Sequence, residues 1–374
     1  MPCKDATEPN FSRSICIFGT CVSPGCGNAS CNAIGPGFKL ADTGERTCFD
    51  TSKELDLCQG TVGMDSCTVT PFCGQDAQYG WDVEHAASTR FARDKSVTDQ
   101  PVALDQVTGL EWQACPVGLS GNYCTTGTAQ KLNWESAVEY CENLVWGGKD
   151  DWYLPDPYQL NSIVDYSRNG PAINFEVFYN TPAEYFWTSS SCASKQDNAW
   201  CVNFNSGGTN IFAKSFDTFT RCVRQGDSLY VASDSVRLYR HEIVAGEPIV
   251  MDNLTGLVWQ GCLPGTSGSN CSSGESMKML WKESLSYCEG LDWGGYNDWR
   301  LPNITELQSI VDTRKNGPAV DIEIFPRTPK DAFWSSSTPP QSPNVAWCVS
   351  FSTGNLSWSG KQYNGNIRCV RKAR

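Results

Sequence analysis

An internal duplication constrains this chain more than any other feature. The segment Thr-Gly-Leu-Glu-Trp-Gln at 108–113 recurs as Thr-Gly-Leu-Val-Trp-Gln at 255–260, an offset of 147 positions. The same offset then relates matching residues without a gap over about 135 positions, including the segments 146–148 and 293–295, 154–155 and 301–302, and 221–224 and 368–371. A repeat of this length has the size of a domain, so we expect two copies of one fold.

The duplication divides the chain into four parts. Residues 90–224 form the first domain, 225–236 a short polar linker and 237–374 the second domain. Residues 1–89 remain as a cysteine-rich N-terminal region, here called the head, which holds nine cysteines. Because the head is rich in Gly, Pro and Ser and poor in apolar residues, we expect disulfides to supply much of its stability.

Charge and hydropathy argue against two classes of partner. The chain carries 29 basic and 41 acidic residues, a net charge of −12. An acidic surface repels phosphate, so we expect no nucleic-acid partner. No apolar run approaches the roughly 20 residues that cross a bilayer, so we expect no membrane span.

The cysteine content indicates an oxidising compartment. Twenty cysteines without a zinc-type spacing are typical of a secreted or cell-surface protein. The first five residues, Met-Pro-Cys-Lys-Asp, lack the basic and apolar regions of a signal peptide. The prediction therefore includes a signal peptide that was removed before this numbering begins.

Two helices are expected early in each domain. In 131–145 the residues Trp134, Ala137, Cys141 and Leu144 follow helical spacing, so Cys141 faces inward. A second helix should begin at 156–157, where aspartate precedes proline. Later segments at 186–189, 199–204 and 221–224 have strand composition and lie between Gly and Asn turns. The predicted class is α+β, with two helices and a small antiparallel sheet in each domain.

Five cysteines recur in both domains, and their positions suggest disulfides. Cys115 with Cys124 would close a local loop, and Cys141 with Cys222 would join the first helix to the last strand. The matching candidates in the second domain are Cys262, Cys271, Cys288 and Cys369.

An extra thiol in the first domain, Cys192, would pair with Cys201. Its counterpart is Pro339, so Cys348 is left over. Three outcomes stay open for Cys348: a bridge to the head, an intermolecular bridge and a free thiol.

The two domains differ most in one stretch near their ends. Twelve of the 14 tryptophans recur at matching positions and are expected to pack the fold. Between them, 205–219 and 352–366 share almost no residues and are rich in Asn, Ser, Gly and aromatics. This composition fits either an adaptable recognition loop or an ordinary variable loop. Candidate ligand-binding residues are Asn203, Asn205, Asn210, Phe212, Asn355, Trp358, Gln362 and Tyr363.

Several motifs together resemble a known family. They are Thr-Gly-Leu-x-Trp at 108–112, Asp-Trp-Tyr-Leu-Pro at 151–155, Trp-Thr-Ser-Ser at 187–190 and the closing Arg-Cys-Val-Arg of each domain. They resemble the bacterial domain of unknown function 1566, also called the Lcl C-terminal domain. The resemblance covers both domains nearly end to end and implies a C-type-lectin-like fold, a scaffold that serves many functions.

The resemblance does not imply a cofactor. The Glu-Pro-Asn and Gln-Pro-Asp motifs of calcium-dependent lectins are absent, so calcium stays an open question and no other cofactor is expected. The acidic composition does not suit the sulfated glycans associated with the family's adhesin. A neutral polysaccharide or a protein surface fits better.

Catalysis is not expected. The chain holds only His85 and His241, without metal spacing, and no phosphate-binding loop. The acidic pair at 150–151 could act in a glycosidase, but the second domain has Asn297 at the first position, as a surface turn allows.

The leading hypothesis is an extracellular recognition or adhesion protein that binds a glycan or surface protein through the divergent stretches. One alternative is a structural subunit that assembles with copies of itself in a filament or cell-surface assembly. A second alternative is a diversified lectin-like receptor.

Overall fold

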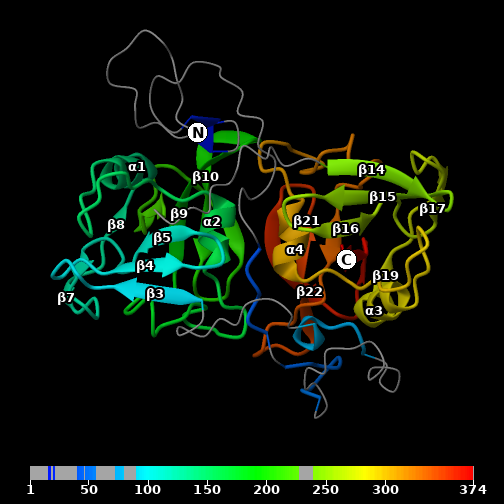
Figure 1. Ribbon diagram of the computed structural model, residues 1–374, viewed down its shortest axis with the longest axis horizontal. Helices are drawn as coiled ribbons and strands as arrows, with labels where there is room; N and C mark the ends of the chain where they lie inside the picture. Colours follow the sequence, from blue (N-terminus) through cyan, green and yellow to red (C-terminus); the bar gives the residue numbers. More distant parts are fainter. Residues whose placement is uncertain are drawn as a thin grey trace, which may run out of the picture. The chain divides into compact units, whose positions relative to one another are not determined.

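The computed structural model describes residues 16–17, 20–21, 40–45, 47–55, 72–79, 90–226 and 239–373. Contacts divide the chain into two units, shown in Figure 1. One unit holds most of the first domain. The other holds the second domain together with the described head residues between 40 and 79. Outside these two domains the described elements are the short strands β1 (Cys16–Ile17) and β2 (Thr20–Cys21) and the 3-10 helix η2 (Asp76–Gln78).

Both domains have the same order of elements. Those of the first are β3 (Phe91–Asp94), β4 (Val102–Asp105), β5 (Leu110–Gln113), β6 (Leu119–Ser120), β7 (Thr126–Gly127), β8 (Lys131–Leu132), α1 (Trp134–Glu142), α2 (Pro157–Ser162), β9 (Tyr185–Cys192), β10 (Lys195–Asn203), β11 (Thr209–Ala213), β12 (Thr218–Phe219) and β13 (Val223–Gln225). Those of the second are β14 (Tyr239–Val244), β15 (Glu247–Asp252), β16 (Leu257–Gln260), β17 (Thr266–Ser267), β18 (Ser273–Gly274), β19 (Met279–Leu280), α3 (Trp281–Glu289), α4 (Ile304–Ser309), β20 (Ala332–Trp334), β21 (Val345–Ser350), β22 (Asn355–Gly360), β23 (Asn364–Gly365) and β24 (Val370–Lys372).

Each domain has a four-stranded antiparallel sheet that contains both its first and its last strand. In the first domain the strand order is β13-β5-β4-β3, and in the second it is β14-β15-β16-β24. The last strand of each domain therefore pairs with a strand near its beginning. The sequence reasoning expected one small sheet per domain and missed this one, because pairing between strands more than 100 residues apart leaves no local pattern.

A second sheet carries the later strands. Its order in the first domain is β11-β10-β9-β12-β8, with a single parallel pair, Phe219 opposite Phe186. In the second domain the matching strands form the sheet β20-β21-β22 and the pair β19-β23. A parallel bridge between Phe333 and Asn366 lies at the same place. The two domains thus share one strand arrangement.

Side-chain caps mark where α1, α2 and α4 begin. Asn133 accepts a hydrogen bond from the Ser136 backbone N–H at the start of α1. Asp156 caps α2, accepting from the backbone N–H groups of residues 158 and 159, and Pro157 stands at the first helical position. Asn303 caps α4 in the same way. None of the helices in the described ranges has the length and apolar content that a membrane span requires.

Tryptophans fill both cores, as expected from their recurrence. In the described part of the chain nine are at most 2% exposed, namely Trp112, Trp152, Trp187, Trp200, Trp259, Trp281, Trp299, Trp334 and Trp347. The Arg-Cys-Val-Arg motif adds a buried cation to each core. Arg221 donates to the backbone carbonyls of Gln113 and Ala114, both at 2.7 Å, and Arg368 makes the same pair of contacts in the second domain. Burying this charge requires those acceptors, which explains why the motif recurs.

Four disulfides join the pairs expected from the sequence. Cys115 bonds to Cys124 and Cys141 to Cys222. Their counterparts in the second domain are Cys262–Cys271 and Cys288–Cys369. In the head, Cys48 and Cys73 are each disulfide-bonded, and the connectivity of the remaining head cysteines lies outside the described residues.

The expected bond between Cys192 and Cys201 is wrong. Both residues are buried free thiols. They lie on neighbouring strands, but Cys192 is opposite Lys195 whereas Cys201 is opposite Trp187. Five residues of strand separate the two positions, roughly 17 Å, which no disulfide spans.

A bridge between Cys348 and the head is also wrong, because Cys348 is a free thiol. Its side chain is buried in β21 beside the Ser357 hydroxyl, 3.5 Å away. Burial raises the pKa of the Cys348 and Cys201 thiols, so both stay protonated and unreactive in the folded protein.

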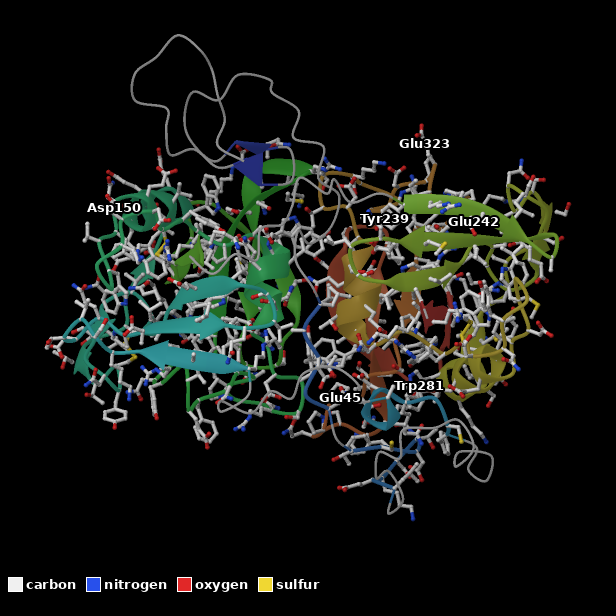
Figure 2. The ribbon with its side chains drawn as sticks, viewed as in Figure 1. Glu45, Asp150, Tyr239, Glu242, Trp281 and Glu323 are labelled. Atoms are coloured by element: carbon white, nitrogen blue, oxygen red, sulfur yellow. A yellow bond between two sulfur atoms is a disulfide. The ribbon has the colours of Figure 1, made fainter. Side chains whose placement is uncertain are left out.

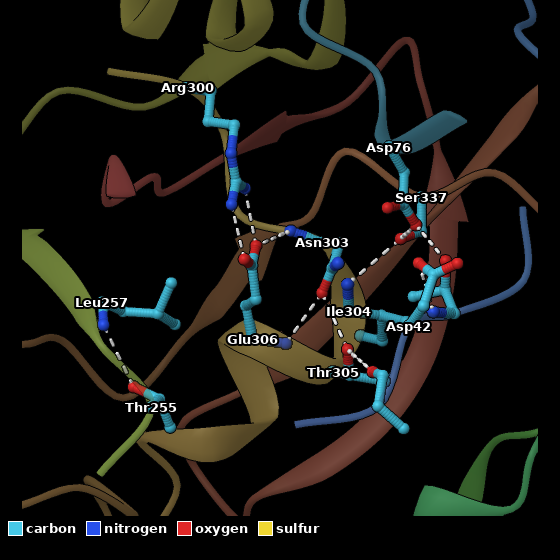
Figure 3. A network of polar contacts seen from close by, with 12 residues as sticks. Asp42, Asp76, Thr255, Leu257, Arg300, Asn303, Ile304, Thr305, Glu306 and Ser337 are labelled. Atoms are coloured by element: carbon cyan, nitrogen blue, oxygen red, sulfur yellow. Dashed lines mark hydrogen bonds and ion pairs between the residues drawn. The ribbon is translucent and has the colours of Figure 1, made fainter. Parts of the chain in front are cut away.

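The described head segments pack on the second domain through a buried polar network (Figure 3). Asp76 accepts hydrogen bonds from the hydroxyls of Thr43 and Ser337, at 2.7 and 2.6 Å. Glu45 accepts from the Thr338 backbone N–H at 3.1 Å. This part of the head therefore shares the interior of the second domain.

Candidate ligand-binding surface

The two stretches that diverge in sequence each contain the outer strand of a β-hairpin together with the turns on either side of it. Residues 205–219 contain β11, which is an outer strand of its sheet, and 352–366 contain β22, which is an outer strand of the matching sheet. β11 pairs with β10 and β22 with β21 in the same register, so Trp200 lies opposite Ile211 and Trp347 opposite Trp358. The expectation of loops is corrected for this part of each stretch, where side chains diverge on strands that pair in the same way in both domains.

Candidate residues of the first domain are mostly engaged within the fold. The Asn203 side chain accepts from the Asn205 backbone N–H at 2.9 Å, and Asn210 accepts from the Ile211 N–H at 2.8 Å. Phe212 is half-buried and meets the Tyr185 ring edge-on, with centroids 4.7 Å apart. Of the four predicted residues only Asn205 is exposed.

Candidate residues of the second domain are more accessible. Trp358 is 48% exposed, although one edge of its ring contacts Trp347 with centroids 5.3 Å apart. Gln362 is exposed, and Tyr363 is 62% exposed. Asn355 is half-buried, with its side-chain oxygen shielded from solvent. Trp358, Gln362 and Tyr363 therefore present accessible side chains close together in the sequence.

A pair of matching turns follows the outer strands, and we call them the aromatic turns. The first comprises residues 213–216 and the second 360–363. In each, the last residue donates its backbone N–H to the carbonyl of the first, from Phe216 to Ala213 and from Tyr363 to Gly360, both at 2.9 Å. Such a bond defines a β-turn.

A lysine anchors each aromatic turn, half-buried in the first domain and buried in the second. The Lys214 ammonium lies 4.2 Å from the ring centroid of Trp134, the first residue of α1. Lys361 lies 3.7 Å from the matching ring of Trp281 in α3. These cation–π contacts hold the second residue of each turn inward. Burial lowers the pKa of both lysines, that of Lys361 to about 7.

The last residue of each turn points outward. Phe216 is 61% exposed, nearly the same as Tyr363. The sequence reasoning singled out Tyr363 but missed Phe216. The signal was present, since both residues occupy the same repeat position and are aromatic within a stretch where little else matches.

The arrangement offers an exposed ring beside an outer strand in each domain. A ring face packs against apolar surfaces, including the apolar face of a sugar, and outer strands provide backbone N–H and C=O groups for hydrogen bonds. The exposed groups of these turns therefore suit the binding of a ligand surface.

Comparison with known proteins identifies both domains. Residues 101–224 and 248–371 each match the Lcl C-terminal domain. No curated protein matches the chain. The two matched segments cover well over half of the sequence and coincide with the two copies of the fold described above. The chain therefore belongs to the Lcl C-terminal domain family and carries two of its domains in tandem.

Proposed function

We propose that this protein is a non-catalytic extracellular recognition or adhesion protein. Its two C-type-lectin-like domains each bind a glycan or another surface ligand through the aromatic turn and the adjoining outer strand. The observation that carries the proposal is the pair Phe216 and Tyr363. Both rings are more than half exposed on turns that share a hydrogen bond and a lysine–tryptophan contact, although the surrounding side chains differ.

Packing does not account for these two rings. A residue that stabilises the core is buried, and an exposed aromatic side chain gains little from folding. Covering such a ring with a ligand would contribute roughly 1.5–3 kcal/mol. The lysine anchor and the turn hydrogen bond fix the backbone in advance, which lowers the entropy lost on binding.

Two domains in one chain favour a repetitive ligand. Individually weak sites that engage the same polymer gain affinity through their high effective concentration. A polysaccharide or a densely displayed surface protein provides such repeats. The net charge of −12 favours neutral ligands over sulfated ones.

The filament alternative gains no support from Cys348 as a thiol for bridges between copies. Cys348 is buried between β20 and β22 on the central strand of its sheet. A bridge would require that sheet to open.

A glycan array probed with the purified full chain tests the proposal. We expect binding to neutral polysaccharides, and a loss of roughly 10-fold in affinity for Tyr363→Ala and for Trp358→Ala. Tyr123→Ala serves as the matched control, because Tyr123 is 55% exposed and its ring contacts Tyr179 and Lys95, which belong to neither turn. Binding that is unchanged in the turn variants, or that falls equally in the control, would refute the assignment.

A further inference from the structure

A pocket of about 390 Å³ opens in the second domain. It lies at the sheet that contains β15 and β16, and Figure 1 shows these strands. Ile249, Met251 and Val258 form an apolar wall. The segment 295–298, Arg371 of β24 and Ala373 complete the lining. This size suits a small organic molecule, and the aromatic turns do not contribute to it.

Arg371 gives the pocket its chemistry. Its side chain is only 3% exposed, and its Nε and Nη2 donate to the two Asp298 oxygens at 2.5 and 3.0 Å. The Tyr296 ring covers the guanidinium, with 3.9 Å between the charge centre and the ring centroid. Among the described residues no acceptor bonds to Nη1. Arg371 therefore keeps one donor for a ligand.

The first domain shows what that donor binds. There Arg224 holds Asp151 through Nε and Nη2 in the same way, and its Nη1 donates to Glu111 at 2.5 Å. Glu111 lies directly opposite Arg224 on the neighbouring strand. In the second domain the residue opposite Arg371 is Val258. One domain thus supplies a carboxylate from its own chain where the other presents a valine and a pocket.

Two further sequence differences leave fewer negative charges around the arginine of the second domain. Lys149 and Asp150 of the first domain, the latter projecting from the surface in Figure 2, correspond to Tyr296 and Asn297. Around its arginine the first domain has three carboxylates, Glu111, Asp150 and Asp151, and two cations, Lys149 and Arg224. At the matching positions the second domain has one carboxylate, Asp298, and one cation, Arg371. An incoming carboxylate therefore meets less repulsion in the second domain.

We propose that the second domain binds the carboxylate of a small organic acid in this pocket. The carboxylate accepts a hydrogen bond from Arg371 Nη1, in the position that the Glu111 carboxylate occupies in the first domain. The body of the acid packs on Ile249 and Val258 and against the Tyr296 ring. The apolar wall favours acids with an apolar body over fully hydroxylated ones. No residue of the aromatic turns lines this pocket, so the proposed acid site can be tested independently of the proposed function.

Ligand-observed NMR titration of the full chain tests the proposal. Phenylacetate represents an apolar acid, glucuronate a sugar acid, and phenylacetamide a neutral molecule of the same shape. For phenylacetate we expect a dissociation constant on the order of 1 mM, and for the amide binding weaker by about 10-fold or more. Glucuronate distinguishes the source of the acid: binding tighter than that of phenylacetate would overturn the preference for an apolar body.

A single substitution gives the second test. Val258→Glu places in the second domain the carboxylate that the first domain already accommodates, and it should abolish phenylacetate binding. Val258→Ala, which adds no charge, should retain it, and circular dichroism checks that both variants fold. If Val258→Glu fails to fold, the acid-against-amide comparison in the native protein decides alone. Equal binding of acid and amide, undiminished binding to a folded Val258→Glu variant, or no binding of either acid at about 10 mM would overturn the proposal.

Discussion

The two disulfides of the first domain close loops of very different length, and their removal should differ accordingly. Cys141 and Cys222 are 81 residues apart, whereas Cys115 and Cys124 are 9 apart. In the loop-entropy model the long closure stabilises the folded state by about 4.5 kcal/mol and the short one by about 2.6 kcal/mol. Replacing both cysteines of a pair by alanine should therefore destabilise the domain by about 2 kcal/mol more for the long loop.

The comparison is internally controlled. All four side chains are completely buried, so the packing lost on replacing two cysteines by two alanines is similar for both pairs. Hydrogen exchange measured on peptides from β5 and β13 gives the opening free energy of this domain separately from that of the other. The same comparison in the second domain, with Cys288–Cys369 and Cys262–Cys271, provides a replicate. An equal loss for both pairs, or a larger loss for the short loop, would refute the entropic reasoning.

Three further outcomes follow from buried groups. Burial raises the pKa of Asp156 from 3.8 to about 7, so the unfolded chain ionises first and the stability of the first domain should fall as pH rises from about 4 to about 7. Asp156→Asn, which copies Asn303 of the second domain, should abolish this decline in pH-dependent urea unfolding, and a variant that keeps the decline would contradict the assignment. Cys192, Cys201 and Cys348 should resist iodoacetamide in the native protein at neutral pH and react after unfolding; non-reducing peptide mapping that finds any of them in a disulfide would contradict the structure. Arg221→Met should destabilise the first domain by about 3 kcal/mol in the same unfolding assay, because two buried carbonyls lose their donor, and a change below about 1 kcal/mol would show that solvent replaces the guanidinium.

The sequence reveals those features that depend on local pattern or on repetition. Asp156 and Pro157 predict the start of α2, because an aspartate N-cap followed by proline favours the beginning of a helix in any surroundings. The disulfide between Cys141 and Cys222 follows from recurrence at matching positions. Cys192 and Cys201 show the limit of this reasoning, since nearness along a hairpin does not give nearness in register.

The candidate sites depend on register and burial, and the sequence alone carries neither. The exchange of Glu111 for Val258 is visible in the repeated Thr-Gly-Leu-x-Trp motif, but only strand pairing places those residues opposite Arg224 and Arg371. Likewise Phe212 and Phe216 are both phenylalanines of the same stretch, yet Phe212 is half-buried and Phe216 is exposed. The pairing of strands distant in the chain decides both cases.

The central claim is that both aromatic turns take part in recognition. Its most direct test is the dissociation rate of the full chain from a polysaccharide-coated surface that it binds, measured for the native protein, Phe216→Ala, Tyr363→Ala and the double variant. Each single substitution should raise the dissociation rate by roughly 10-fold. The double variant should dissociate much faster than either single variant, because no second site retains the polymer. A double variant that dissociates as slowly as the native protein would contradict the account.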